Sequence, residues 1–405
     1  SGVRWQIGED VSGLGAIRNM QDPTLFGDPD KMTSSYYNAI TCGDSTSQCD
    51  NGGVHANSGV NNKAVYLVTD GGTFNGQTVT TLGITKVAKI YYEVQTSLLT
   101  SGADYADLYD ALYQGCLNRV GTAGITSTDC QEVRDATNAV EMNQQPVSGY
   151  NPEAPVCPSG QSPTNLFFDS LESGTGNWTF GVVTGTSRWR LDTTPPFGPF
   201  AHSGAHSLYA DDFPASTSDS YAAMNTSVAL PAGAYLHFAH AYGFEDPNHD
   251  GGVLEYSTNG GGSWTDAGSL FDTNGYDGTL SSGNPLGSRS AFLADSHGYI
   301  SSRLNLSSLA GQSVRFRWRM GIDSSVYDWG WWVDDVRIYT CAATATATPT
   351  ATATQTSTPT PTVTGTPPST PSAPTSLAAT ANSSTQITLT WADVSNNEDG
   401  FKIER

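Results

Sequence analysis

Apolar positions in the first third of the chain recur at helical spacing. The clearest stripe repeats at intervals of three or four residues: Ile84, Val87, Ala88, Tyr91, Val94 and Leu98. This spacing places the apolar side chains on one face of a helix. Similar stripes predict further helices over 104–120, over 128–142 with Thr128 and Gln131 as a capping box, and just after residue 59. Residues 1–148 are therefore predicted to be mainly helical.

From about residue 157 the period of the pattern changes to two. In the segment 313–320 apolar residues alternate with Arg315, Arg317 and Arg319, as in a strand with one buried face. Segments 234–242, 252–258 and 331–340 are also rich in strand-forming residues, and glycine-rich turn sequences lie between them. This arrangement predicts an all-β jelly-roll sandwich over 157–341.

The last part of the chain contains a linker and the start of another module. Residues 342–373 carry no charge and consist largely of Thr, Ala and Pro, so they are predicted to form a disordered linker. Residues 374–405 alternate like two strands and resemble the opening of a fibronectin type III domain, with Trp391 as its core tryptophan. About a third of such a β-sandwich would be present, so this domain is expected to be truncated and the chain multidomain.

Composition narrows the classes of function. The net charge of −21, from 39 acidic against 18 basic residues, argues against nucleic acid or an anionic membrane as a partner. No run approaches the ~18–20 apolar residues that span a bilayer. The first residues lack the basic and apolar regions of an export signal, so the chain is expected to start after such a signal or to be a fragment.

Six cysteines suggest a disulfide framework. Loop lengths and segment boundaries favour the pairs Cys42–Cys49, Cys116–Cys130 and Cys157–Cys341, although the sequence alone permits 15 connectivities. Metal ligation by cysteine is the competing interpretation, and the absence of a C-x-x-C pair weighs against it. Disulfides would place the protein in an oxidising compartment, which predicts a secreted, extracellular protein.

One motif is more specific than these patterns. The segment "DNGGVHANSGVNNKAVYL", residues 50–67, resembles thermolysin-like (M4 family) zinc metallopeptidases. The segments "WQIGEDVSG", "AIRNMQDPTLFGDPD", "GGTFNGQTVT" and "KVAKIYYEVQTSLLT" resemble the same family in the same order. The resemblance covers residues 4–142 and implies the C-terminal helical lobe of a thermolysin-like catalytic domain.

The resemblance implies roles for five residues. His55 would stabilise the oxyanion formed during peptide hydrolysis, and Asp50 would orient its imidazole. A carboxylate on the other ring nitrogen holds a histidine in the arrangement that such a donor needs. Arg18 would bind the substrate carbonyl, Ile17 would line the pocket after the scissile bond, and Glu9 would bind calcium.

The zinc ligands of this family do not appear in the sequence. None of the seven histidines lies in an H-E-x-x-H arrangement, and the resemblance places the zinc ligands and the general base ahead of Ser1. The predicted function is therefore a C-terminal fragment of a secreted zinc metalloendopeptidase, which hydrolyses protein or peptide substrates by zinc-activated water. The fragment alone is expected to be inactive, and a monomer is expected.

The β region resembles jelly-roll modules such as MAM domains, on the segments "LFFDSLESGTGNWTF", "HSGAHSLYADD" and "DWGWWVDDVRIYTC". Asp169, Glu172, Asp334 and Asp335 could hold structural calcium or form only a solvated acidic edge. Tryptophans among 329–332 could bind a surface polymer or glycan, or could be buried in the sandwich. The alternative function is a non-catalytic extracellular binding or adhesion protein with a degenerate peptidase lobe.

Overall fold

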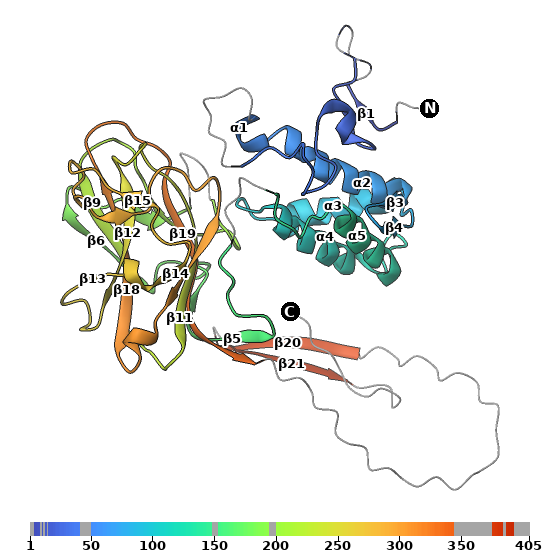
Figure 1. The fold of residues 1–405 in the computed structure, drawn as a ribbon. Helices are drawn as coiled ribbons and strands as arrows, with labels where there is room; N and C mark the ends of the chain where they lie inside the picture. The colour runs from blue at the N-terminus through green and yellow to red at the C-terminus, as the bar shows by residue number, and fades with distance from the viewer. Residues whose placement is uncertain are drawn as a thin grey trace. The chain divides into compact units, whose positions relative to one another are not determined.

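The computed structural model describes residues 4–8, 10, 13, 15–40, 50–147, 153–193, 200–343, 375–383 and 386–392. For residues 51, 375–383 and 386–392 it describes the backbone alone. The chain forms two compact units, 1–345 and 346–405. The first unit contains a helical region followed by a β-sandwich (Figure 1), which confirms the predicted multidomain order of helices and then strands.

The helical region is built on four helices of 12 to 15 residues, which follow one short α-helix and two short 3-10 helices. Its elements are β1 Gln6–Ile7, β2 Arg18–Asn19, η1 Pro23–Phe26, α1 Asp50–Gly53, η2 Ala56–Ser58, α2 Gly59–Asp70, β3 Gly72–Phe74, β4 Gln77–Val79, α3 Ile84–Ser97, α4 Tyr105–Arg119 and α5 Ser127–Ala139. Of the stripe predicted for α3, Val87 and Val94 are buried against the other helices, whereas Ile84 and Ala88 are exposed; Ile90, which the prediction did not include, is buried with them. Apolar faces on α2, α4 and α5 complete this core.

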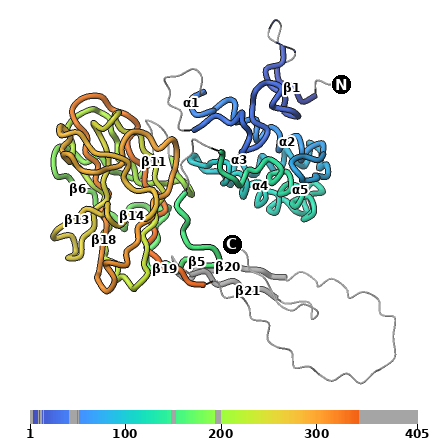
Figure 2. Tube along the Cα trace, viewed as in Figure 1, coloured from blue at the N-terminus to red at the C-terminus, as the bar shows by residue number. Residues whose placement is uncertain are grey.

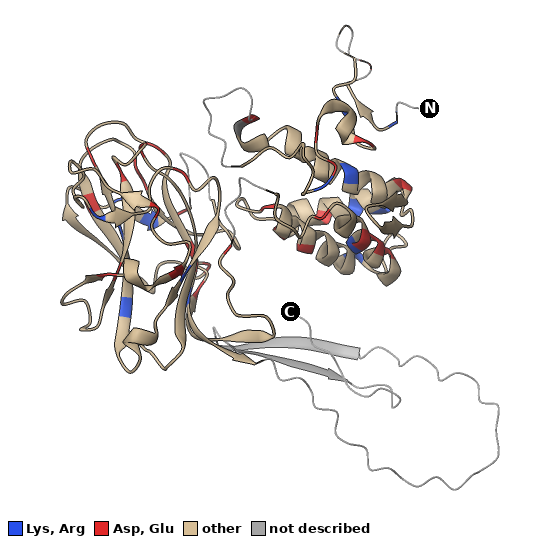
Figure 3. Cartoon of the chain, in the orientation of Figure 1, with Lys and Arg blue, Asp and Glu red and all other residues tan. Residues whose placement is uncertain are grey.

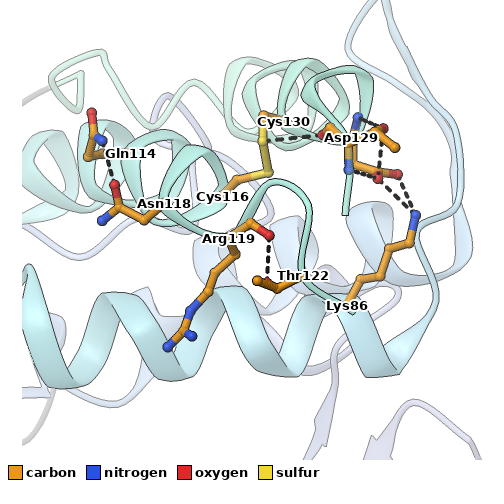
Figure 4. The surroundings of a disulfide bond; sticks show 9 residues. Lys86, Gln114, Cys116, Asn118, Arg119, Thr122, Asp129 and Cys130 are labelled. Carbon is orange, nitrogen blue, oxygen red and sulfur yellow. Dashed lines mark hydrogen bonds and ion pairs between the residues drawn. A yellow bond between two sulfur atoms is a disulfide. The ribbon is translucent and has the colours of Figure 1, made fainter. Parts of the chain in front are cut away.

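The start of α5 differs from the prediction. Thr126, rather than Thr128, is the N-cap, and it exchanges hydrogen bonds with Asp129 in a capping box. The bond Cys116–Cys130 joins α5 to α4 beside this cap (Figure 4). Lys86 of α3 forms an ion pair with Asp129 at 2.8 Å, so the cap also ties α5 to α3. Burial tends to raise the pKa of Asp129, but the hydrogen bonds that its carboxylate accepts from Lys86 and Thr126 outweigh burial, so the pKa is lowered.

Glu141 connects the end of the helical core to the segment that contains Lys31 and Thr33. Its carboxylate accepts hydrogen bonds from Lys31 Nζ at 2.9 Å, Asn75 Nδ2 at 2.8 Å, and the N–H and hydroxyl of Thr33. Burial tends to raise the pKa of Glu141, but these donors lower it to about 2. The ionised carboxylate therefore stabilises the folded state.

This pKa predicts an acid-dependent loss of stability in the helical region. The contribution of Glu141 is fully present above the pKa of an unfolded glutamate and is lost as the pH falls toward about 2. It corresponds to roughly 3 kcal/mol. Urea unfolding followed by helical circular dichroism should show wild type more stable than Glu141→Gln at pH 6, with the difference vanishing near pH 2. A difference that does not change with pH would contradict the prediction.

The sandwich consists of two antiparallel sheets (Figure 2). One has the order β13-β12-β18-β9-β6 with β10 on β18, and the other has the order β14-β17-β11-β19-β8-β7 with β5 on β19. The strands are β5 Gln161–Asp169, β6 Trp178–Thr184, β7 Trp189–Leu191, β8 Leu208–Ala210, β9 Ser218–Met224, β10 Val228–Ala229, β11 Ala234–Gly243, β12 Gly251–Ser257, β13 Thr265–Asp266, β14 Phe271–Thr273, β17 Ile300–Asn305, β18 Ser313–Ile322 and β19 Gly330–Ala343. A separate pair is β15 Gly278–Thr279 with β16 Ser290–Ala291, and short 3-10 helices are η3 Gly268–Leu270 and η4 Ser307–Leu309.

The alternation predicted for β18 decides which face of that strand is buried. Phe316 and Trp318 point into the core between the sheets, where Trp318 packs edge-on against Trp178. Arg317 and Arg319 lie on the opposite face and form ion pairs with Glu255 of the neighbouring β12. The long β19 carries two of the tryptophans whose burial was in question: Trp331 and Trp332 are buried, whereas Trp329 just before the strand is about half exposed.

A second disulfide, Cys157–Cys341, connects the segment before β5 to the end of β19. β19 continues to Ala343, two residues into the segment predicted to be linker. Cys42, Cys49 and the rest of the predicted linker lie outside the described residues. The Cys42–Cys49 disulfide and the disorder of the linker therefore remain predictions.

The second compact unit contains one antiparallel pair, β20 Thr375–Ser383 with β21 Gln386–Ala392. Two strands agree with the predicted pattern, and the fibronectin type III assignment remains a prediction. Among the described residues, none of the helices combines the length and the apolar character needed to cross a membrane.

Candidate functional site

His55 and Asp50 lie together on the short helical turns before α2. The Nδ1 atom of His55 is 2.6 Å from Asp50 Oδ1, while the other carboxylate oxygen accepts the backbone N–H groups of His55 and Ala56. The His55 side chain is 74% exposed, so its other ring nitrogen, Nε2, is accessible. The carboxylate therefore fixes the ring at Nδ1 and leaves Nε2 available to a ligand.

The hydrogen bonds that Asp50 accepts keep its carboxyl group ionised. Burial tends to raise the pKa of Asp50, but the hydrogen bonds from the His55 ring and from the two N–H groups lower it, so Asp50 is a carboxylate. A ring that donates from Nδ1 to this carboxylate can also donate from Nε2 only as imidazolium.

The two glycines between Asp50 and His55 are required by the path of the backbone. Gly53 has φ of +81°, and a Cβ there would lie 2.1 Å from Asn57 Nδ2. That amide nitrogen donates to Asn38 O and Gly52 O, and Asn57 Oδ1 accepts the N–H of Asn38. Asn57 is buried, so it fastens the turn that carries His55 to the chain on its other side.

A pair of glycine substitutions separates this contact from backbone strain. Gly53→Ala and Gly76→Ala both place an alanine at φ near +80°, but a Cβ at Gly76 meets no heavy atom within 4 Å. We expect Gly76→Ala to lose about 1–2 kcal/mol of unfolding free energy from strain alone. Gly53→Ala should lose about 2–3 kcal/mol more, because the Asn57 amide is displaced from its acceptors. Equal losses in urea unfolding would show that Asn57 does not hold this turn.

Arg18, on β2, is brought to the same place from a distant part of the sequence. Its Nη1 atom donates to the carbonyl oxygen of His55 at 2.6 Å and to Ser58 Oγ, and Ser58 Oγ donates to the same carbonyl. Arg18 also acts on Asp28: burial raises the pKa of Asp28, Arg18 opposes that rise, and the charge of Asp50 adds to it. The guanidinium thus supports the backbone of the histidine turn.

The structure describes Ile17, another predicted site residue, but not Glu9. Ile17 precedes Arg18 and is 48% exposed, as a residue that lines a substrate pocket could be. Glu9 lies outside the described residues, so calcium binding there remains a prediction. Arg4, near the predicted calcium residue, forms an ion pair with Asp70 at 2.9 Å.

Comparisons with known proteins support the interpretation of this region. A family model described as "Thermolysin metallopeptidase, alpha-helical domain" matches residues 1–142. This segment is a thermolysin-like α-helical domain. A "Zinc metalloproteinase" of Renibacterium salmoninarum is 45% identical over 139 residues, which are 34% of this chain and 25% of that protein. A "Thermolysin" of Alicyclobacillus acidocaldarius is 39% identical over 140 residues, 34% of this chain and 23% of that protein.

The chain spans about a quarter of the length of these relatives. Among solved structures, one of TmCBM61 in complex with β-1,4-galactotriose is 14% identical, with a TM-score of 0.29, and the match covers 44% of this chain and 99% of that chain. The relatives thus bear on the thermolysin-like domain and not on the sandwich.

The described part of the thermolysin-like domain contains no cluster of three or more side chains suited to hold a metal ion. Two other histidines that lie close together in the sequence, His237 and His240, are on β11 of the sandwich. His237 Nε2 is 3.0 Å from Ala154 O, and His240 Nε2 is 2.9 Å from Ser302 Oγ.

The acidic residues considered for calcium in the sandwich are occupied by protein donors. Asp169 accepts bonds from the N–H of Leu171 and the side chains of Asn177 and Trp178. Glu172 accepts the N–H groups of residues 205 and 206, and Asp334 those of residues 202 and 203. Asp169 and Asp334 are buried, so the solvated acidic edge does not describe them, and calcium binding there remains a prediction.

Several supporting residues of the histidine turn were not predicted from the sequence. Asn57 and Ser58 lie inside the motif that identified His55, and their polar side chains at a tight turn were a usable signal. Tyr105, at the start of α4, donates to Asn57 O at 2.7 Å. No local pattern marks this contact, since 48 residues separate the two positions.

Proposed function

We propose that this chain is the C-terminal part of a secreted zinc metalloendopeptidase, in which His55 stabilises the oxyanion formed during peptide hydrolysis. The observation that carries the proposal is the 2.6 Å contact between His55 Nδ1 and Asp50 Oδ1, on a ring whose far side is exposed. The match of residues 1–142 to a thermolysin metallopeptidase domain supports the reaction class.

The proposed mechanism divides the reaction between this domain and residues ahead of Ser1. Zinc, held by ligands in that preceding part, would supply the activated water and polarise the peptide carbonyl. The residues described above bind and orient: His55 Nε2 donates a hydrogen bond to the carbonyl oxygen as negative charge develops on it. Asp50 holds the ring in place, and Arg18 holds the carbonyl of His55. The remaining N–H groups of Arg18 are proposed to bind the substrate carbonyl.

The partners and location follow from the same proposal. Protein and peptide substrates, an extracellular location and a monomer are proposed, with the two disulfides supporting an oxidising compartment. Net charge disfavours nucleic acid and anionic membranes. The sandwich is proposed to hold the enzyme near a surface polymer or glycan, since Trp329 is half exposed at one end of it.

The test is made on the protein extended to include its preceding segment. That segment should contain an H-E-x-x-H motif and a later glutamate ligand, and the extended protein should hydrolyse casein. A zinc chelator should abolish the hydrolysis and added zinc should restore it. Activity undiminished by the chelator would reject the zinc mechanism. A preceding segment without ligands, together with no hydrolysis, would favour the non-catalytic binding protein.

A further inference from the structure

A glutamate, a histidine and an aspartate meet among the loops of the sandwich. Glu245 follows β11, which belongs to the seven-stranded sheet. His249 precedes β12 and Asp323 follows β18, and these two strands are neighbours in the six-stranded sheet. Figure 3 shows acidic positions among the loops of the sandwich. One ligating atom from each of the three side chains lies within 4.8 Å of the other two, and among the described residues this is the one group so placed.

A single turn of backbone makes Glu245 and His249 neighbours. The carbonyl oxygen of Glu245 accepts the N–H of His249 at 3.2 Å, which is the bond between residues four apart that closes a helical turn. Within the turn, Asn248 donates from Nδ2 to Thr279 O at 3.0 Å, and its own carbonyl accepts the N–H of Ser281 at 2.9 Å. The turn that carries two of the three side chains is therefore held in place by the segment 279–281.

Buried polar side chains hold Asp323 beside this turn. Asn284 is buried, and its Nδ2 atom donates to His249 O and to Gly321 O, each at 2.8 Å. Asp250, the residue after His249, accepts the N–H of Asp323 with Oδ1 at 2.6 Å. These bonds fix the start of β12 to the end of β18, so the backbones of His249 and Asp323 are positioned by the fold itself.

The side chains of the group point ligand atoms at one another without bonding one another. Oε2 of Glu245 is buried and has no hydrogen-bond partner. Asp323 Oδ1 accepts the N–H and the hydroxyl of Ser325, which orients the carboxylate. Its Oδ2 atom lies 3.9 Å from His249 Nδ1, too far for a hydrogen bond. A buried acceptor without a partner is costly, and a cation between these atoms would remove that cost.

We propose that Glu245, His249 and Asp323 bind one Zn²⁺ ion, with water as the fourth ligand, and that this ion links the two sheets. Zinc accepts imidazole nitrogen and carboxylate oxygen together, whereas calcium and magnesium prefer oxygen alone. At zinc bond lengths of about 2.0–2.2 Å, two ligand atoms on a tetrahedral ion lie about 3.4 Å apart, so the side chains close by about 1 Å on binding. The His249 side chain is 44% exposed and free to make this movement. The site does not depend on the peptidase proposal.

Zinc titration of the whole chain tests the site after removal of metal with a chelator. Isothermal titration calorimetry should give one site with a dissociation constant on the order of 10⁻⁵ M or below. Seven of the nine tryptophans lie between residues 178 and 332, so tryptophan fluorescence reports unfolding of the sandwich. At about 100 times the dissociation constant the thermal midpoint should rise by about 5–10 °C. No binding heat and no shift up to about 1 mM zinc would overturn the proposal.

Two histidines of the sandwich provide a matched pair of variants. His297 Nδ1 lies 3.8 Å from Asp295 Oδ1, nearly the same separation as between His249 and Asp323, but His297 belongs to no group of three ligating side chains among the described residues. His249→Ala should weaken zinc binding at least about tenfold and remove the rise in midpoint. His297→Ala should bind zinc within about twofold of wild type. Equal weakening by the two variants would contradict a site at His249.

A third variant separates ligation from folding. Glu245→Gln keeps the shape of the side chain and should also weaken zinc binding about tenfold or more. Without zinc it should unfold at the same temperature as wild type or higher, because a buried charged acceptor without a partner is removed. Unchanged zinc affinity with a lowered midpoint would mean that Glu245 is structural and not a ligand. Calcium binding that His249→Ala leaves unchanged, with no zinc binding, would replace zinc by an ion with oxygen ligands alone.

Discussion

Replacing His55 with alanine should lower kcat of the extended enzyme by about 10²–10³-fold, with a much smaller change in KM. Because the proposed bond from Nε2 strengthens only as charge develops on the carbonyl oxygen, its loss acts on the transition state and not on substrate binding. The effect corresponds to roughly 2.7–4 kcal/mol of transition-state stabilisation. Hydrolysis of a short peptide under steady-state conditions, with separate kcat and KM, measures it.

Asp50→Asn should have a smaller effect, about 10–100-fold in kcat. The Asn side chain retains an oxygen that can accept the Nδ1 proton, so the ring keeps its position, but the negative charge beside the ring is lost. The double variant should resemble His55→Ala alone, since Asp50 acts through the histidine. Additive losses would mean that Asp50 has a separate role.

Stability and a distant histidine provide the controls for these variants. The His55 side chain is 74% exposed, so His55→Ala should unfold at the same urea concentration as wild type. His206→Ala, on the sandwich, should leave kcat unchanged. If His55→Ala retains kcat within twofold while its fold is intact, the proposed role of His55 is wrong.

The histidine pair could be predicted because its information is local. Five residues separate Asp50 from His55, and the motif around them carries the glycines and Asn57 that the turn requires. The support given by Arg18 could not be derived from spacing, since it lies 37 residues from His55 and depends on how β2 packs.

The helices show the same division between local pattern and tertiary packing. Periodicity predicted α3 over 84–98, and the helix runs from Ile84 to Ser97. For α5 the predicted capping pair, Thr128 with Gln131, was wrong. The structure uses Thr126 with Asp129, where Lys86 also binds the carboxylate. The predicted end at Met142 was also wrong: Met142 is buried, but the helix stops at Ala139 and residue 141 has φ of +58°.

Loss of the disulfide Cys157–Cys341 should destabilise the sandwich more than any single surface substitution. The bond joins residues separated by 184 positions, so nearly the whole sandwich lies inside the closed loop. In the chain-entropy model a loop of this length corresponds to about 5 kcal/mol of stabilisation, because the bond restricts the unfolded chain. The double variant Cys157→Ala/Cys341→Ala should therefore unfold at a markedly lower urea concentration when followed by tryptophan fluorescence.

The disulfide Cys116–Cys130 supplies a matched comparison inside the same chain. Cys116–Cys130 closes a loop with a separation of only 14 and lies in the helical core, so Cys116→Ala/Cys130→Ala should cost about 3 kcal/mol there. Each double variant should lower mainly the transition of its own region, read by helical circular dichroism or by tryptophan fluorescence. An equal loss from both pairs would show that loop length does not govern their stabilisation. In that case the native contacts beside β5 and β19, which pair along the edge that Cys157 closes, would have to replace chain entropy as the explanation.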